Sequence, residues 1–284
     1  MVKNIMNTIR KSLTVLACAA LLTGCASNTP TSTAASSSNS SDTLRVGMEC
    51  NYAPFNWSTT KEGEYTQPIS SADYCDGYDV VVAKNLADKI GKKVEIVKLD
   101  WDNLILSLNN NQIDAVIAGM TATDERKQQV NFTDPYYVSE EVLIVKKDSQ
   151  YTSAASLEDF KGATVQGQMN TIYDEVIDQI PGVNHMPAAE TFPAAIQALQ
   201  AGSVDAVTSE LPVANGVISA NPDLAVVRFA EGKGFKADTS VSIAVRKNDD
   251  ELLNALQDAL KTIDTDTRNT WMEEAVNRQP ASEE

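Results

Sequence analysis

The chain has 284 residues, a length that suits one large domain or two domains of medium size. Hydrophobic residues make up 43% of it, which is enough for a packed core and too many for a disordered chain. The formal net charge is −16, which disfavours contact with a phosphate backbone, so we expect no binding to nucleic acid.

Residues 1–24 are typical of a targeting segment. The basic stretch MVKNIMNTIRKS precedes the apolar run LTVLACAALL, which is too short to span a bilayer comfortably. The next residues, LTGC, resemble the lipobox of bacterial lipoproteins, in which the cysteine receives a lipid and becomes the new N-terminus. We therefore expect a signal peptide over 1–24, a lipid on Cys25 and an extracytoplasmic protein anchored to the cell membrane. The alternative is an ordinary secretory signal with a chance cysteine.

The stretch that follows Cys25, ASNTPTSTAASSSNSSD, contains almost no large apolar residue and cannot bury a core. We expect residues 25–42 to form a flexible tether between the lipid and a folded domain.

Four cysteines are present, and two of them belong to the folded part of the chain. Cys18 leaves with the signal peptide and Cys25 is the lipidation site, so Cys50 and Cys75 remain as an even pair. In an exported domain they suit a disulfide, and two free thiols are the alternative. The spacings of metal sites are absent, and the single histidine, His185, lies in a polar GVNHMP loop where we expect a solvated residue. We expect no metal and no cofactor.

From Thr43 onwards, segments typical of strands alternate with segments typical of helices. This alternation predicts an α/β fold with mainly parallel sheets covered by helices. We expect 250–264 to be a strongly amphipathic final helix. The expected strands are 43–48, 93–99, 113–120, 142–147, 163–167, 204–210 and 240–247. The expected helices and helical turns are 78–91, 101–111, 156–162, 190–202 and 250–264.

Two segments, LILSLNNNQIDAVIAGM and AAIQALQAGSVDAVTSE, share one plan: a helix, a short polar turn and a strand containing (I/V)-D-A-V. In open α/β sheets, ligands bind beyond the carboxyl ends of the strands. The first strand leads to Thr121 and Arg126, and the second leads to Glu210. The sequence thus predicts one cation and one anion at two strand ends, although two unrelated helix–turn–strand units remain the alternative.

These residues together match the shape of an α-amino acid. Arg126 can hold a carboxylate through two parallel hydrogen bonds, and Gly119 lets the backbone approach closely. Glu210 can hold an ammonium group, while Tyr52 and Trp101 can form flat apolar walls. Taken alone, Arg126 is more typical of a surface or ion-pair arginine, Trp101 of a core residue and Glu210 of a solvated residue.

The chain resembles the polar amino acid binding proteins of ATP-driven importers, the bacterial solute-binding protein family 3, from about Leu44 to Trp271. The segments that carry the resemblance are VGMECNYAPF, GYDVVVAKNLADKIG and, most specifically, AGMTATDERKQQVNFTDPYY. The segment VQGQMNT, which contains Gln168 and Met169, departs from the family pattern. The connection 56–76 is also longer than usual, and we expect it to edge the cleft.

The resemblance implies a role for each site residue. Arg126 would clamp the ligand α-carboxylate with help from the Thr121 amide, and Glu210 would pair with the α-ammonium. The Gly119 carbonyl and the Thr121 hydroxyl would accept hydrogen bonds from that ammonium. Glu49 would face the ligand side chain, and the helix start after β-strand 163–167 would supply amide donors. The expected ligand-binding set is Glu49, Tyr52, Trp101, Ala118, Gly119, Thr121, Arg126, Asn170, Thr171 and Glu210.

The resemblance also implies a two-lobed type II periplasmic-binding-protein fold, with two mixed sheets flanked by helices and a two-strand hinge. Lobe 1 would comprise 43–135 and 242–284, and lobe 2 would comprise 139–236. The hinges would lie near 134–138 and 237–241.

The function implied is that of a monomeric protein that captures a free L-amino acid, closes, and delivers it to the membrane subunits of an importer. Glu49 favours a cationic or neutral polar ligand side chain over an acidic one. We expect no enzymatic activity. The alternatives are a cleft enzyme of the cyclohexadienyl dehydratase type, with Glu49 or Glu210 as general acid, and a ligand-sensing lipoprotein that reports to a membrane partner.

Overall fold

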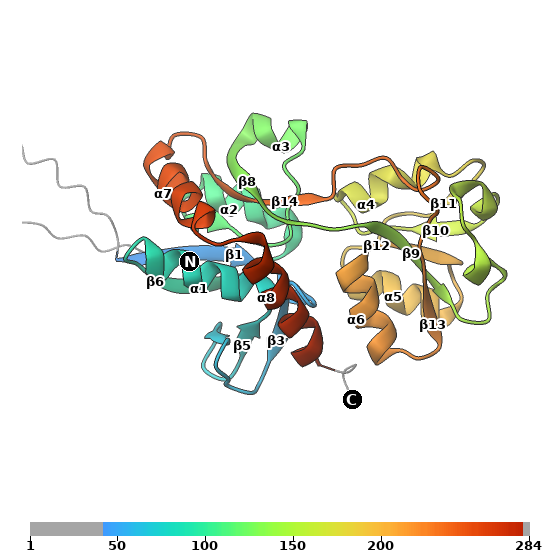
Figure 1. Cartoon of the computed structure of the whole chain (residues 1–284), viewed down its shortest axis with the longest axis horizontal. Helices are drawn as coiled ribbons and strands as arrows, with labels where there is room; N and C mark the ends of the chain where they lie inside the picture. The colour runs from blue at the N-terminus through green and yellow to red at the C-terminus, as the bar shows by residue number, and fades with distance from the viewer. Residues whose placement is uncertain (1–41, 281–284) are drawn as a thin grey trace, which may run out of the picture. The chain divides into compact units, whose positions relative to one another are not determined.

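Two five-stranded sheets organise residues 42–280, the part of the chain that the computed structural model describes (Figure 1). The first sheet has the order β6-β1-β7-β14-β8, and the second has the order β11-β10-β12-β9-β13. The strands of the first sheet are β1 (Thr43–Met48), β6 (Lys93–Lys98), β7 (Ala115–Val116), β8 (Val130–Val138) and β14 (Ser240–Arg246). The strands of the second sheet are β9 (Glu141–Lys146), β10 (Thr164–Gln166), β11 (Asn184–His185), β12 (Ala206–Glu210) and β13 (Leu224–Val227).

Both sheets are mixed, which confirms that part of the expected fold class. In the first sheet, β1 runs parallel to β6 and β7, while β14 runs antiparallel to β7 and β8. In the second, β10 runs parallel to β11 and β12, while β9 runs antiparallel to β12 and β13. The prediction of mainly parallel sheets was therefore too strong. The lobe and hinge boundaries stay a prediction.

Helices pack beside both sheets, as the alternating pattern predicted (Figure 1). Burial of apolar side chains holds these helices in place, as α1 shows. Its first residues, including Val80 and Val82, are fully buried, while Asp88 and Lys89 face solvent. The helices are α1 (Tyr78–Lys89), α2 (Leu104–Asn109), α3 (Asp124–Gln129), α4 (Ile172–Glu175), α5 (Phe192–Ala201), α6 (Leu211–Ala220), α7 (Asp250–Lys261) and α8 (Thr265–Arg278). The 3₁₀ turns are η1 (Trp101–Asn103), η2 (Gln150–Ser153), η3 (Leu157–Phe160) and η4 (Val176–Gln179).

The prediction that 250–264 forms the final helix was wrong, because α8 follows α7. The side chain of Asp264 caps α8 by accepting a hydrogen bond of 2.7 Å from the Thr267 N–H. Only Met272 and Ala275 of α8 are fully buried, so its apolar face is too sparse to produce a clear helical pattern in the sequence. The helix packs against α1 and β8 on one side and α6 on the other.

The strand predicted over 113–120 is also shorter than expected, since only Ala115–Val116 form a ladder. Ile117 and Ala118 stay buried, which explains the continuous apolar run. The chain then turns at Gly119, whose φ of +62° lies in the left-handed region that favours glycine.

The long connection 56–76 forms a small sheet together with Asn51–Tyr52. Its strands are β2 (Asn51–Tyr52), β3 (Asn56–Thr59), β4 (Gln67–Pro68) and β5 (Tyr74–Asp76), in the order β2-β3-β5-β4. A disulfide joins Cys50 to Cys75, with a Cα–Cα distance of 5.7 Å. Arg278 of α8 pairs with Asp76 at 3.1 Å and lies 4.3 Å from the centre of the Tyr65 ring. The small sheet is thus attached to the rest of the fold through Cys75 and Asp76 of β5.

The expected signal peptide, the lipidated Cys25 and the tether up to Ser41 lie outside residues 42–280. Within that range, none of the helices has the length and apolar character needed to cross a bilayer. The same residues contain no group of three or more His, Cys, Asp or Glu placed to hold a metal ion.

Candidate functional site

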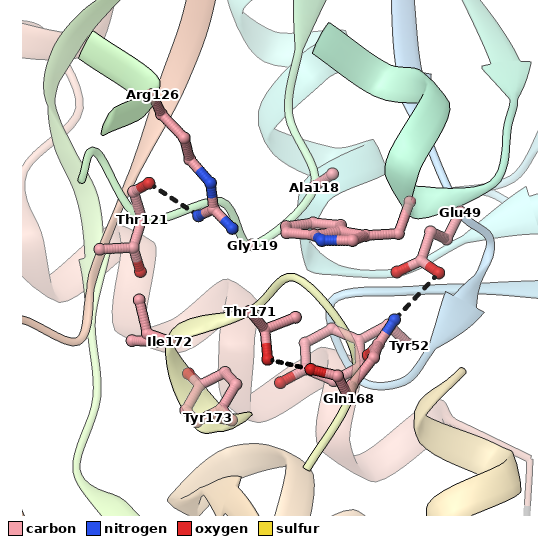
Figure 2. Close-up of a pocket in the computed structure, with 11 residues that line it drawn as sticks. Glu49, Tyr52, Ala118, Gly119, Thr121, Arg126, Gln168, Thr171, Ile172 and Tyr173 are labelled. Atoms are coloured by element: carbon pink, nitrogen blue, oxygen red, sulfur yellow. Dashed lines mark hydrogen bonds between the residues drawn. The ribbon is translucent and has the colours of Figure 1, made fainter. Parts of the chain in front are cut away.

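A small pocket lies where strand ends of both sheets meet, and it contains most of the residues predicted to bind a ligand (Figure 2). Its cavity volume of about 20 Å³ gives room for about one water molecule. The residues that line it are Glu49, Tyr52, Trp101, Ala118, Gly119, Thr121, Arg126, Gln168, Thr171, Ile172 and Tyr173. Of the expected set, only Asn170 and Glu210 are not among them.

Arg126 reaches the pocket from the first turn of α3. The Thr123 side chain caps this helix by accepting a hydrogen bond of 3.2 Å from the Arg126 N–H. The guanidinium group donates to the Thr121 carbonyl at 2.9 Å and to the Asn170 carbonyl at 2.8 Å. It also lies 5.1 Å from the centre of the Trp101 ring, within the range of a cation–π contact. Burial lowers the pKa of Arg126, yet an arginine keeps its charge in a protein.

Glu49 is the carboxylate that lines the pocket directly. It follows β1 and is only 6% exposed, and its Oε1 accepts a hydrogen bond of 3.3 Å from Gln168 Nε2 (Figure 2). Burial raises the pKa of Glu49 to about 7; the Gln168 hydrogen bond acts against this, and the nearby Asp100 and Asp102 add to it. A cation in the pocket would therefore be attracted to three acidic groups at this end.

Glu210 lies behind the pocket wall at the end of β12 and is fully buried. Its Oε1 accepts a hydrogen bond of 2.8 Å from the Tyr52 hydroxyl, and its Oε2 accepts one of 2.6 Å from Ser139 Oγ. Burial raises the pKa of Glu210, while the hydrogen bonds from Ser139, Tyr52 and Tyr173 lower it. Glu210 does not line the pocket itself, but it is hydrogen-bonded to Tyr52, which does.

Gly119 turns the backbone beneath the pocket. Its N–H donates a hydrogen bond of 2.9 Å to the Tyr136 hydroxyl oxygen. A side chain at this position would meet the Tyr52 ring at 3.5 Å, an ordinary contact, so its positive φ rather than lack of space favours glycine.

The second sheet contributes the turn between β10 and α4. Asn170 adopts a left-handed conformation with a φ of +58°, and its carbonyl accepts hydrogen bonds from Trp101 Nε1 at 3.0 Å and from Arg126. Its side-chain amide donates to Asp102 Oδ1 at 2.7 Å. The Thr171 hydroxyl donates to the Gln168 carbonyl at 2.7 Å. Helix α4 has only four residues, so its N-terminus offers less to a carboxylate than the sequence suggested.

Three lining residues were absent from the predicted set: Gln168, Ile172 and Tyr173. Gln168 was noted only as a departure from the family pattern. Ile172 and Tyr173 directly follow Thr171, and an aromatic residue at the start of a helix after a strand was the signal that could have identified them. His185 lies away from the pocket in β11, where its ring nitrogens face Asp174 at 3.0 Å and Asp178 at 2.9 Å.

Residues 44–274 match the model of the bacterial extracellular solute-binding proteins, family 3. The chain is 34% identical over 239 residues to the arginine-binding extracellular protein ArtP of Bacillus subtilis, covering 82% of this chain and 87% of ArtP. It is 31% identical over 226 residues to the L-cystine-binding protein TcyJ of Escherichia coli, covering 79% of this chain and 78% of TcyJ.

A solved structure has a similar fold. It is an amino acid ABC transporter substrate-binding protein, AbpA of Streptococcus pneumoniae, bound to L-arginine. The TM-score is 0.71 at 26% identity, and the match covers 86% of this chain and 97% of that protein.

Proposed function

The chain belongs to the bacterial extracellular solute-binding proteins of family 3, and from this premise we propose that it captures a free L-amino acid and delivers it to an ATP-driven importer. The observation that supports this most is the pocket itself, which joins the cation of Arg126, the buried carboxylate of Glu49 and the aromatic rings of Tyr52 and Trp101. The structural likeness to AbpA agrees with the expected two-lobed type II fold.

In this proposal each side of the pocket recognises one part of the ligand. Arg126 binds the α-carboxylate, with the Thr121 amide as a second donor. The α-ammonium lies near Tyr52, where the buried charge of Glu210 attracts it and the Gly119 carbonyl and the Thr121 hydroxyl accept its hydrogen bonds. Trp101 and Tyr52 pack on the ligand's apolar part. Because these groups are desolvated, a molecule without the carboxylate or the ammonium leaves one of them unpaired and binds poorly.

We infer that the ligand side chain is cationic, with arginine as the first candidate. Glu49 lines the pocket with Asp100 and Asp102 near it, and these acids favour a positive group and disfavour glutamate or aspartate. ArtP is named as arginine-binding and AbpA was solved with L-arginine, which supports this choice.

The test is a thermal-shift screen of the twenty amino acids, followed by calorimetry on those that raise the melting temperature. We expect L-arginine or L-lysine to give the largest shift and the acidic amino acids to give none. If no amino acid shifts the melting temperature, the proposed function is wrong; if an acidic one binds best, the role of Glu49 is wrong.

We propose that the pocket binds without catalysing a reaction. Glu49 and Glu210 are the two carboxyl groups that could act as a general acid. Incubation of the purified protein with prephenate or arogenate, followed over hours, should show no loss of either compound. Measurable turnover would favour the dehydratase alternative.

We also propose that the mature protein is a monomer held at the outer face of the cell membrane by the lipid on Cys25. Replacing Cys25 with serine should move the protein from the membrane fraction to the soluble fraction of the host culture. The unchanged protein should release only with detergent. Retention of the serine variant in the membrane fraction would count against the lipid anchor. The alternative function, a ligand-sensing lipoprotein, requires a signalling partner in the membrane, which a pull-down from membranes would reveal.

A further inference from the structure

A carboxylate outside the pocket, that of Asp79, lies at the centre of a buried chain of hydrogen bonds. Asp79 belongs to the first turn of α1 and is 0% exposed. Its Oδ1 accepts a hydrogen bond of 2.7 Å from the Tyr136 hydroxyl, and its Oδ2 accepts one of 2.8 Å from Asn56 Nδ2.

Both donors accept in turn from a backbone N–H at the end of a strand. The Gly119 N–H donates to the Tyr136 oxygen at 2.9 Å, and the Cys50 N–H donates to Asn56 Oδ1 at 2.7 Å. Gly119 lines the pocket, and Cys50 directly follows Glu49, which also lines it. The hydrogen-bond chain therefore begins in one pocket loop and ends in another.

The direction of every bond in this chain is fixed by chemistry. A backbone N–H can only donate, so the Tyr136 oxygen and Asn56 Oδ1 must accept at the two ends. This leaves the Tyr136 hydrogen and the Asn56 NH₂ group pointing inward. The group between them must accept twice, and an ionised carboxylate satisfies both donors.

The two loops benefit from such support for different reasons. Cys50 is a non-glycine residue with a φ of +53°, a conformation that persists only where surrounding contacts hold it. Gly119, with a φ of +62°, is free of that strain, but a glycine can adopt many conformations and the bond to Tyr136 selects one. An ionised carboxylate at position 79 is energetically unfavourable in this buried site. Burial raises the pKa of Asp79 to about 7, although the hydrogen bonds from Tyr136 and Asn56 lower it. A neutral core residue would have avoided that cost if packing were its only role.

We propose that ionised Asp79 is a positioning residue of the amino acid site, which holds the Glu49–Cys50 segment and the Gly119 turn in their binding geometry through Asn56 and Tyr136. The proposal rests on the proposed function, and it adds a residue that does not touch the ligand. The donor-to-acceptor direction of these hydrogen bonds makes the proposal testable, because one substitution can break this direction and a second can restore it.

Asp79→Asn breaks the chain while keeping its shape. The new amide offers one acceptor and one NH₂ donor, so a donor faces either the Tyr136 hydroxyl or the Asn56 NH₂ group. The double variant Asn56→Asp/Asp79→Asn restores the chain. The carboxylate, now at position 56, accepts from the Cys50 N–H and from the amide at position 79, whose oxygen accepts from Tyr136.

The first measurement is the affinity for L-arginine by calorimetry. We expect Asp79→Asn to weaken it by about 10-fold or more, as for an unpaired buried donor, and the double variant to return to within about 3-fold of the natural protein. Asp88→Asn, the same change at an exposed position of α1, is the control and should leave affinity unchanged. A role in stability alone predicts that folded Asp79→Asn binds L-arginine as tightly as the natural protein. Unchanged affinity in folded Asp79→Asn, or a folded double variant that stays as weak as Asp79→Asn, overturns the proposal.

The second measurement needs no ligand and therefore separates this proposal from the proposed function. Amide hydrogen exchange in the ligand-free protein reports on the two end groups directly. Tyr136→Phe removes only the arm to Gly119, so the Gly119 amide should exchange about 10-fold faster while the Cys50 amide keeps its rate. Tyr78→Phe is the matched control, because its hydroxyl bonds the Tyr136 carbonyl at 2.9 Å and lies outside the chain.

Equal exchange at Gly119 in Tyr136→Phe and in the natural protein would overturn the proposal even if Asp79→Asn failed to fold. If the natural protein bound no L-arginine, the exchange result would still show whether the hydrogen-bond chain holds the Gly119 turn, and only the choice of ligand would be wrong.

Discussion

The two sheets hold their pocket residues in different ways. The loops after β1 and β7 of the first sheet are tied to groups that lie outside the pocket, namely the Asp79 carboxylate and the Cys50–Cys75 disulfide. The turn 168–171 of the second sheet is tied to its own sheet by the Met169 N–H, which donates to the Ala189 carbonyl at 2.8 Å. Its other polar contacts cross the pocket, to Glu49, Trp101, Asp102 and Arg126. The first half of the site is thus preorganised, whereas the geometry of the second half depends in part on contact with the first. Changes in the first half should have the larger effects.

The largest effect is expected at Arg126. We expect Arg126→Ala to lower the affinity for every α-amino acid by about 3–5 kcal/mol, because it removes one member of a desolvated charged pair. Calorimetry with L-arginine measures the change. Lys127→Ala is the control, since Lys127 is the next residue of α3 and its side chain is 55% exposed. Normal binding by Arg126→Ala would remove the central contact of the proposed site.

The disulfide should come next, and its effect is on stability. The bond links cysteines separated by 25 residues, and replacing both with serine should lower the free energy of unfolding by about 2–4 kcal/mol. Urea denaturation under non-reducing conditions measures this. Reductant should destabilise the natural protein by a similar amount and leave the double serine variant unaffected. A smaller loss would mean that the Asp79 hydrogen bonds alone hold the loop.

A buried carboxyl group of the second sheet should make the stability of the protein depend on pH. Glu141 of β9 lies opposite Glu210, is 9% exposed, and has no hydrogen-bond partner on either oxygen. Burial raises the pKa of Glu141 from 4.5 to about 8, and the charge of Glu210 adds to this. Between these two values the folded chain keeps a proton that the unfolded chain releases, so stability falls as pH rises through this range.

Glu141→Gln removes that dependence. We expect the variant to be more stable than the natural protein by about 1–3 kcal/mol at pH 9 and nearly equal to it at pH 5, measured by urea denaturation at both values. Glu140→Gln is the neighbouring control, because the Glu140 side chain is 39% exposed and paired with Arg228. An equal gain at both pH values would show that ionisation of Glu141 is not the cause.

The smallest effect is expected at the second-sheet turn. Asn170→Gly keeps the left-handed backbone and removes only the side-chain amide that bonds Asp102 across an exposed edge of the pocket. Its affinity for L-arginine should change by less than about 1 kcal/mol, since an exposed hydrogen bond contributes little. Asn170→Ala removes the same amide but strains the backbone, so it should cost about 1 kcal/mol more. A large loss in the glycine variant would show that the second half of the site contributes as much to binding as the first.

The sequence predicted the first half of the site better than the second, for the same physical reason. Gly119, Thr121 and Arg126 lie within eight residues, and their local conformation fixes their spacing. Their strand end was therefore recognisable, although the strand itself proved to be two residues long. The turn that contains Gln168 and Asn170 has no such local rule, because its contacts with Glu49 and Arg126 lie more than 40 residues away.

Two other features were beyond local patterns. Helix α8 buries too few apolar residues to show a periodic face. The hydrogen bonds of Asp79 join Asn56 and Tyr136, which lie 23 and 57 residues away in the sequence, and no spacing rule connects them. The α/β class follows from alternating segments, each of which is a property of a short stretch of chain, whereas the mixed sheets were implied by the family resemblance and not by the alternation.

The cavity of about 20 Å³ also constrains the timing of recognition. Every amino acid is larger than the single water molecule that such a space admits, so none can reach Arg126 until the walls of the pocket part. We therefore expect opening of the pocket to precede binding, so that the fraction of open protein affects the observed dissociation constant. In rapid mixing, with the change in total tryptophan fluorescence on binding as the signal, the observed association rate should level off at high ligand concentration. The plateau value would be the rate constant for opening of the pocket.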